Sequence, residues 1–146
     1  NTKDLTSLMV LVNMIVDIER IGDYSKNILD LAINFPDALN TKYLHKDLHD
    51  VEKAVKERFD HTIHAVKTRD EKIARNLLKG IKEEVTMASD RIVNNIIAGD
   101  LEFESGSEAA AIALYARYLK RIGSHLKNIT STIVNPIDSI GYKLQK

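Results

Sequence analysis

Two acidic side chains in the first third of the chain have the spacing of a metal site. Glu19 and Asp23 are an i,i+4 pair, so a helix would place both carboxylates on one face, one turn apart. Oxygen ligands of this kind suit Mg, Ca, Mn or Fe. The pair borders the apolar stripe through Ile15, so it needs a metal or a cationic partner unless it lies on a solvated face. The spacing alone leaves these three alternatives open.

The histidines give a weaker metal pattern. His45 and His49 have i,i+4 spacing, and His61 and His64 have i,i+3 spacing, with acidic residues close by in sequence. They lack the His-Glu-x-x-His pattern of zinc enzymes and the recurring Glu-x-x-His pairs of di-iron bundles. Histidines on a charged helix face are usually solvated, and we interpret these four residues in that way.

Catalysis by a nucleophile has little support in the sequence. Ser124 and His125 are adjacent, and consecutive residues of a helix diverge by about 100°, so the two cannot act as parts of a triad. The six glycines form neither of the usual phosphate-binding loops, and the chain has no cysteine. We therefore predict that the protein is not an enzyme.

The composition limits the partners and the compartment. Lys plus Arg and Asp plus Glu both number 21 in 146 residues, so the formal net charge is zero and nothing favours binding to a nucleic acid. The absence of cysteine excludes a disulfide scaffold and thiolate metal sites. The most apolar stretch, 5–18, is too short to span a membrane and does not read as a signal peptide. We expect a cytoplasmic protein with no direct membrane insertion.

Helices must position the candidate residues, because apolar residues recur at spacings of three and four and strong breakers are few. We predict helices at about 4–34, 44–67, 70–98 and 107–135, with a kinked extension to 144. Together they form an all-α, antiparallel bundle of four long helices in a single domain, 1–146.

Capping residues and apolar faces refine this picture. Asp4, Asp70 and Ser107 are the expected N-caps. The first helix is apolar on nearly every side and should be central, whereas the second carries one apolar stripe and should be outer. A basic run on the third helix is either a solvated face or a patch for a partner, and it consists of Lys72, Arg75, Lys79 and Lys82.

One segment of the first helix is repeated in the fourth. The sequence IERIGDYSKNI at 18–28 is echoed by LKRIGSHLKNI at 119–129, and we call these the first and the second motif. The spacing of about 100 residues exceeds the usual periods of solenoid repeats, so duplication of a multi-helix unit explains it better.

Each motif contains a glycine in mid-helix. Such a glycine sacrifices about 1 kcal/mol relative to Ala, and its use is the close approach of another backbone or side chain. We predict that the two motif helices cross near Gly22 and Gly123, and that His125 packs or forms hydrogen bonds there instead of binding a metal. The motif residues assigned to this crossing are Arg20, Gly22, Asn27, Arg121, Gly123, His125 and Asn128.

The first motif resembles that of the PhoU family of phosphate-uptake regulators. The family motif is Glu-Arg-Ile-Gly-Asp on a long helix followed by Asn-Ile, and the family's members carry two similar three-helix units that each end in it. The first helix here then corresponds to the end of the first unit, and the other three helices form the second. On this resemblance the two opening helices of a full-length member are missing.

The resemblance implies a non-enzymatic regulator or accessory module of phosphate uptake or phosphate signalling. It would contact a phosphate transporter or a sensor kinase. One alternative is the cytoplasmic PhoU-like domain of a sodium-phosphate cotransporter, since similar domains occur there. Another is a metal-binding helical bundle of unrelated role, and a generic helical scaffold is a third.

The resemblance also bears on metal binding. Members of the family often hold metal ions through acidic residues that correspond to Glu19 and Asp23. The resemblance therefore makes Fe, Mn, Zn or Mg the candidate cofactors, although it requires none of them. The second motif departs from this pattern, because Lys120 and Ser124 stand at the matching positions. We hypothesise that Lys120 partly replaces a metal through an internal ion pair across the repeat.

The first helix also raises the question of oligomeric state. A helix that is apolar on nearly every side needs partners on several sides, and four helices leave part of 5–18 uncovered. We therefore expect a homodimer.

Overall fold

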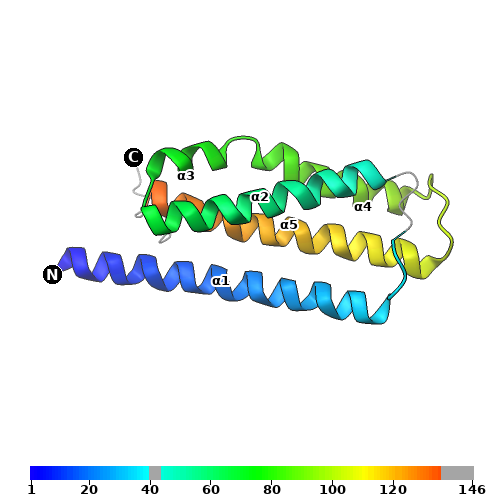
Figure 1. Ribbon diagram of the computed structural model, residues 1–146, viewed down its shortest axis with the longest axis horizontal. Coiled ribbons are helices and arrows are strands. Elements are labelled where there is room, and N and C mark those ends of the chain that lie inside the picture. Colours follow the sequence, from blue (N-terminus) through cyan, green and yellow to red (C-terminus); the bar gives the residue numbers. More distant parts are fainter. Residues whose placement is uncertain (40–43, 136–146) are drawn as a thin grey trace.

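The computed structural model describes residues 1–39 and 44–135, which are helical with short connections and contain no strand. The helices are α1 (Thr2–Asn34), α2 (His45–Thr68), α3 (Glu71–Leu78), η1 (Lys82–Met87), α4 (Ala88–Ala98) and α5 (Gly106–Val134). They form an elongated antiparallel bundle in which α3, η1 and α4 follow one another along a single rod (Figure 1). The predicted all-α bundle is confirmed, and the expected extension to 144 lies outside the described residues.

The helix ends follow local capping chemistry. Asp70 caps α3 as predicted, because its carboxylate accepts from the Ile73 backbone N–H at 3.0 Å. The other two expected N-caps are wrong. Asn1 caps α1 in place of Asp4, and Ser105 caps α5 in place of Ser107. In both cases a side-chain oxygen just outside the predicted start reaches an N–H of the first turn, so each helix begins earlier than expected.

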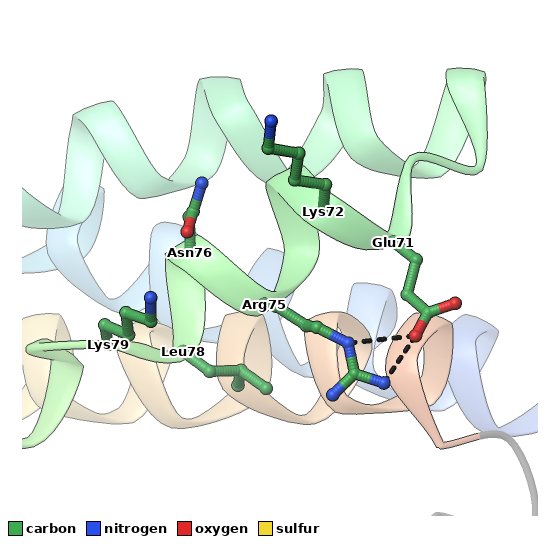
Figure 2. Close-up of a pocket in the computed structure, with 6 residues that line it drawn as sticks. All are labelled: Glu71, Lys72, Arg75, Asn76, Leu78 and Lys79. Atoms are coloured by element: carbon green, nitrogen blue, oxygen red, sulfur yellow. Dashed lines mark hydrogen bonds and ion pairs between the residues drawn. The ribbon is translucent and has the colours of Figure 1, made fainter.

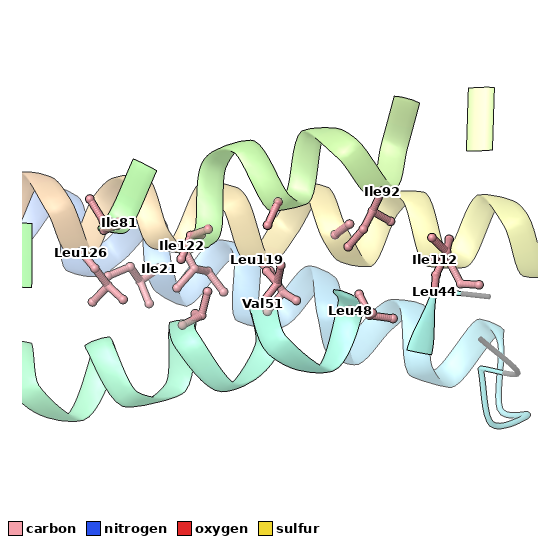
Figure 3. Close-up of a cluster of buried hydrophobic side chains, with 14 of the residues drawn as sticks. Ile21, Leu44, Leu48, Val51, Ile81, Ile92, Ile112, Leu119, Ile122 and Leu126 are labelled. Atoms are coloured by element: carbon pink, nitrogen blue, oxygen red, sulfur yellow. The ribbon is translucent and has the colours of Figure 1, made fainter. Parts of the chain in front are cut away.

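The central helix of the bundle is α5, because it packs against every other helix of the described chain. The main hydrophobic core lies along it, and Figure 3 shows side chains from the surrounding helices meeting there. The prediction that the first helix is central is wrong: α1 packs against α5 alone and forms the edge of the bundle, where most of its apolar side chains are exposed. None of the described helices is both long and apolar enough to span a membrane.

The third predicted helix is interrupted. Lys79 is extended, Gly80 has a positive φ of 76°, and the π-helix η1 follows. Arg58 of α2 stabilises the break, since its nearly buried guanidinium donates to the carbonyl oxygens of Leu77 and Lys79 and to Glu84 Oε2 at 2.8 Å. These bonds satisfy carbonyls that the end of α3 leaves without helical partners. The hairpin of α2 with α3 is confirmed, but a continuous helix over 70–98 is not.

Candidate functional site

The seam between α1 and α5 contains a polar cluster centred on Asp17. Asp17 Oδ1 lies 2.8 Å from His125 Nδ1 and accepts a hydrogen bond from Asn128 Nδ2 at 3.2 Å. The side chains of Asp17 and His125 are only 13% and 12% exposed. The other ring nitrogen of His125, Nε2, is buried without a hydrogen-bond partner in the described chain. His125 therefore acts as a hydrogen-bonding residue between the motif helices, as predicted.

Aromatic contacts extend this seam along the two motifs. Arg121 Nε donates to the Tyr24 hydroxyl at 3.1 Å, and its guanidinium carbon lies 5.7 Å from the centre of the Tyr24 ring. Tyr24 also stacks on His125, with 6.0 Å between ring centres, and approaches Tyr118. The arginine of the second motif thus binds α1 to α5 through a hydrogen bond and a cation–π contact.

The arginine of the first motif has a different role. Arg20 points to solvent, where it forms a loose ion pair with Asp23 at 3.8 Å, and both side chains are more than 60% exposed. Such a pair contributes little to stability. The same residue type therefore holds the bundle together in one motif and lies on the surface in the other.

The hypothesis that Lys120 pairs with an acid of the first motif is wrong. Lys120 Nζ lies 2.6 Å from Asp90 Oδ1, so its ion pair runs to α4, whereas Glu19 is exposed on α1. Ser124 donates its hydroxyl to the backbone oxygen of Lys120 at 3.1 Å. Lys120 therefore faces α4 and not the first motif. This is possible because α5 packs against α4 as well as against α1.

The residues of the described chain do not complete a metal site. Glu19 and Asp23 are exposed, and Asp23 already pairs with Arg20. Within residues 1–39 and 44–135, no group of three or more His, Asp or Glu side chains gathers as metal ligands would. Two carboxylates on an open helix face supply too few ligands for the metals considered. Elemental analysis of the purified protein is the test of whether Glu19 and Asp23 hold a metal.

The two motif helices pack together close to the two glycines, through Tyr24 and Arg121, but neither glycine provides this contact, so that part of the prediction is wrong. A Cβ built on Gly22 would meet nothing within 4 Å. A Cβ on Gly123 would lie only 2.7 Å from Val85 Cγ1, so Gly123 provides the close approach of η1 to α5. Glycine is required at one position to admit a side chain from a third segment, and at the other position nothing in the described chain makes use of it.

Two features of the seam and its surroundings escaped the sequence reasoning. Asp17 is the acidic partner of the second motif, and its signal was a charged residue inside the apolar stretch 5–18. Tyr115 donates to Glu52 Oε2 at 2.7 Å and ties α5 to α2; burial and this hydrogen bond raise the pKa of Tyr115. Asn27, one of the motif residues predicted to lie at the helix crossing, is half-buried on α1.

The second helix keeps its histidines at the surface. His49, His61 and His64 are exposed, as expected for a charged helix face. The described chain does not bring them together with enough acidic side chains to form a metal site. The side chain of His45 lies outside the described part of the structure.

Three residues of the basic run, Lys72, Arg75 and Lys79, line an open hollow of about 650 Å³ on α3. Figure 2 shows Arg75 linked to Glu71, while Lys72 and Lys79 point away from that pair. Asn76 and Leu78 complete the lining. The hollow lies just before the break after Leu78 and is open to solvent. Its lining has an excess of positive charge, because Lys72, Arg75 and Lys79 outnumber Glu71.

Comparison with known families identifies the bundle. A family model described as PhoU domain matches residues 48–133. The chain belongs to the PhoU family. The matched range runs from α2 into α5, so it includes the second motif and leaves α1 with the first motif outside. No curated protein and no solved structure matches the chain. A PhoU domain is a helical bundle, in agreement with the fold described above.

Proposed function

We propose that this PhoU-family chain regulates phosphate uptake or phosphate signalling in the cytoplasm by binding a phosphate transporter or a sensor kinase, without catalysing a reaction. The match to a PhoU domain carries the proposal, because members of the family are regulatory proteins and not enzymes. Regulation of this kind requires a surface that a partner protein can recognise.

The polar seam is poorly suited to be that surface. Asp17, Tyr24, Arg121 and His125 are largely engaged with one another between α1 and α5. A partner that bound them would have to break contacts that hold the bundle together. The recognition surface therefore belongs on the outside of the matched domain.

The basic face of α3 meets this requirement. Lys72 and Lys79 are exposed beside the hollow and make no ion pair with another described residue. Arg75 is also exposed, although Glu71 offsets part of its charge. Unpaired cations around a hollow favour an acidic segment of a partner, because complementary charge speeds the encounter and fixes orientation.

The test is phosphate uptake in cells of the source organism that lack this chain. We expect such cells to take up labelled phosphate faster under phosphate-rich conditions, and the wild-type chain to restore restraint. The double variant Lys72→Glu, Lys79→Glu should fold but should not slow phosphate uptake, because the reversed charge repels an acidic partner. Circular dichroism of the purified variant would check its fold.

A matched control keeps the charge change and moves it to another helix. The double variant Lys46→Glu, Lys56→Glu alters the net charge equally at two exposed positions of α2, and it should restore uptake control. Unchanged phosphate uptake and an unchanged phosphate-starvation response in cells without the chain would contradict the proposed function.

A further inference from the structure

The end of the bundle that holds the α2–α3 turn and α3 has a local excess of positive charge. Residues 67–82 contain six Lys or Arg and two acidic residues, a net charge of +4 in a chain whose formal net charge is zero. One of the two acidic residues, Asp70, is engaged in capping the α3 backbone. A concentration of one charge on this part of the surface attracts anions to it.

Four exposed side chains with N–H donors line the hollow on α3. Their i, i+3, i+4 and i+7 spacing places them along one face of the helix, and they are Lys72, Arg75, Asn76 and Lys79. The positions extend over about 10 Å of helix. Figure 2 shows that Lys72 and Lys79 are directed away from the pair of Arg75 with Glu71. Ammonium, guanidinium and amide groups of this kind are donors to phosphate oxygens in proteins.

The backbone at the end of α3 does not oppose an anion in this hollow. The C-terminal end of a helix is normally negative, because its last carbonyl oxygens lack helical partners. At this end the guanidinium of Arg58 donates to the carbonyl oxygens of Leu77 and Lys79. Arg58 also pairs with Glu84, so these contacts offset the negative helix end without adding a net charge.

We propose that this hollow binds a linear chain of linked phosphate groups, as in inorganic polyphosphate. Donors spread along a helix face match a ligand whose charges are also spread along a line, whereas a single phosphate would engage only part of the set. The fork of Arg75 suits two oxygens of one phosphate when it exchanges Glu71 for the ligand. Among the described residues that line the hollow, none is aromatic, so a nucleoside base finds no ring to stack on.

Binding of a phosphate chain here would also regulate the recognition surface. The chain and the acidic segment of a partner would contact the same two lysines, Lys72 and Lys79, so each excludes the other. This consequence rests on the function proposed above, whereas binding of the phosphate chain does not. A ligand made of phosphate would link the occupancy of this face to the supply of phosphate.

Isothermal titration calorimetry of the purified chain with sodium tripolyphosphate tests the site. We expect saturable binding at low ionic strength that weakens as salt is added, because exposed charges are screened. The double variant Lys72→Gln, Lys79→Gln should bind about tenfold more weakly, since it loses two exposed ionic contacts. Glu71→Gln should bind about threefold more tightly, because it frees Arg75 from a competing carboxylate.

A matched control removes the same charge from another helix. The double variant Lys46→Gln, Lys56→Gln loses two exposed ammonium groups of α2 and should keep the affinity of the parent. Equal weakening by the two double variants would overturn the proposal, because net charge and not the hollow would then attract the ligand. Unchanged affinity of Lys72→Gln, Lys79→Gln, or no saturable binding by the parent, would overturn it as well.

Two further ligands test the chemistry of the chain. Orthophosphate should bind more weakly than tripolyphosphate, and ATP should bind no more tightly. Equal affinity for orthophosphate would overturn the proposal, since a single phosphate would then suffice, and clearly tighter binding of ATP would overturn it by showing recognition of a base. The titrations need no partner protein, so their failure would leave the phosphate-uptake assay unaffected, and the two proposals fail separately.

Discussion

The two motif helices have closely similar sequences and opposite environments. In α5 the motif is surrounded: Leu119 is 5% exposed and Gly123 lies under Val85. In α1 the equivalent Ile18 is 56% exposed and Gly22 contacts nothing beyond its own helix. A buried position and a surface position can therefore share one local pattern, and the neighbours alone determine what each residue contributes to stability. The following predictions test this contrast with matched substitutions.

The largest difference is expected between the two aliphatic residues at equivalent positions. Leu119→Ala should lower the free energy of unfolding by about 2–5 kcal/mol, because it removes buried methyl groups and leaves a cavity. Ile18→Ala should change it by less than about 0.5 kcal/mol, since the side chain is half exposed. The midpoint of urea denaturation measures both changes. Equal losses would show that Ile18 is as deeply buried as Leu119.

The next contrast concerns two aspartates of α1. Asp17→Ala should cost about 2 kcal/mol, because it leaves the buried Nδ1 of His125 without its acceptor. The free energy of unfolding of Asp23→Ala should lie within about 0.5 kcal/mol of the parent's, since the pair of Asp23 with Arg20 is exposed. The midpoint of urea unfolding reports both changes. A large effect of Asp23→Ala would point to a ligand or partner at the first motif.

The glycines should respond with opposite signs. Gly22→Ala should stabilise the folded chain by about 0.5–1 kcal/mol through helix propensity alone. Gly123→Ala gains the same propensity, but the new Cβ would overlap Val85 Cγ1, and overpacking costs about 1–3 kcal/mol. We expect a net loss of about 1 kcal/mol there, and Val85→Ala added to Gly123→Ala should recover part of it. Thermal unfolding would show the two signs.

The smallest effect concerns the side of α5 that faces α2. Burial and the hydrogen bond to Glu52 raise the pKa of Tyr115, so the folded state holds this proton more tightly than the unfolded state. The resulting stability is fully present below the unfolded pKa of about 10 and is lost as the pH rises beyond it. Between about pH 9 and 11, the free energy of unfolding of Tyr115→Phe should therefore fall less than that of the parent, by up to about 1 kcal/mol. Identical pH profiles for the parent and the variant would contradict this linkage.

Metal content tests whether Glu19 and Asp23 bind a metal, as the resemblance implies, or lie on the surface without one. Purified protein without a tag should contain less than stoichiometric Fe, Mn, Zn or Mg, because two exposed carboxylates offer too few ligands. The double variant Glu19→Ala, Asp23→Ala is the control. Stoichiometric metal in the parent that is lost in this variant would show that ligands from outside the described residues complete the site.

The sequence predicted the fold class and most helix boundaries, because these depend on local features. Spacings of three and four between apolar residues indicated the helices, and the last residue of α1 is Asn34, two before Pro36. The repeat indicated that two helices share a pattern, and the resemblance that it carried agrees with the family match. The break after Leu78 was missed, although Gly80 was visible as a potential breaker, because the regular apolar spacing continues across it.

The tertiary structure alone decided how each copy of the pattern is used. The sequence could not show that Lys120 pairs with Asp90, that Val85 fits against Gly123, or that Arg58 caps the interrupted helix. Each of these contacts joins residues that are far apart in the chain. Local propensity depends on neighbouring residues in sequence, whereas burial and pairing depend on which faces meet in space. For that reason the sequence by itself determined helices and an internal repeat, and packing determined which copy became the core.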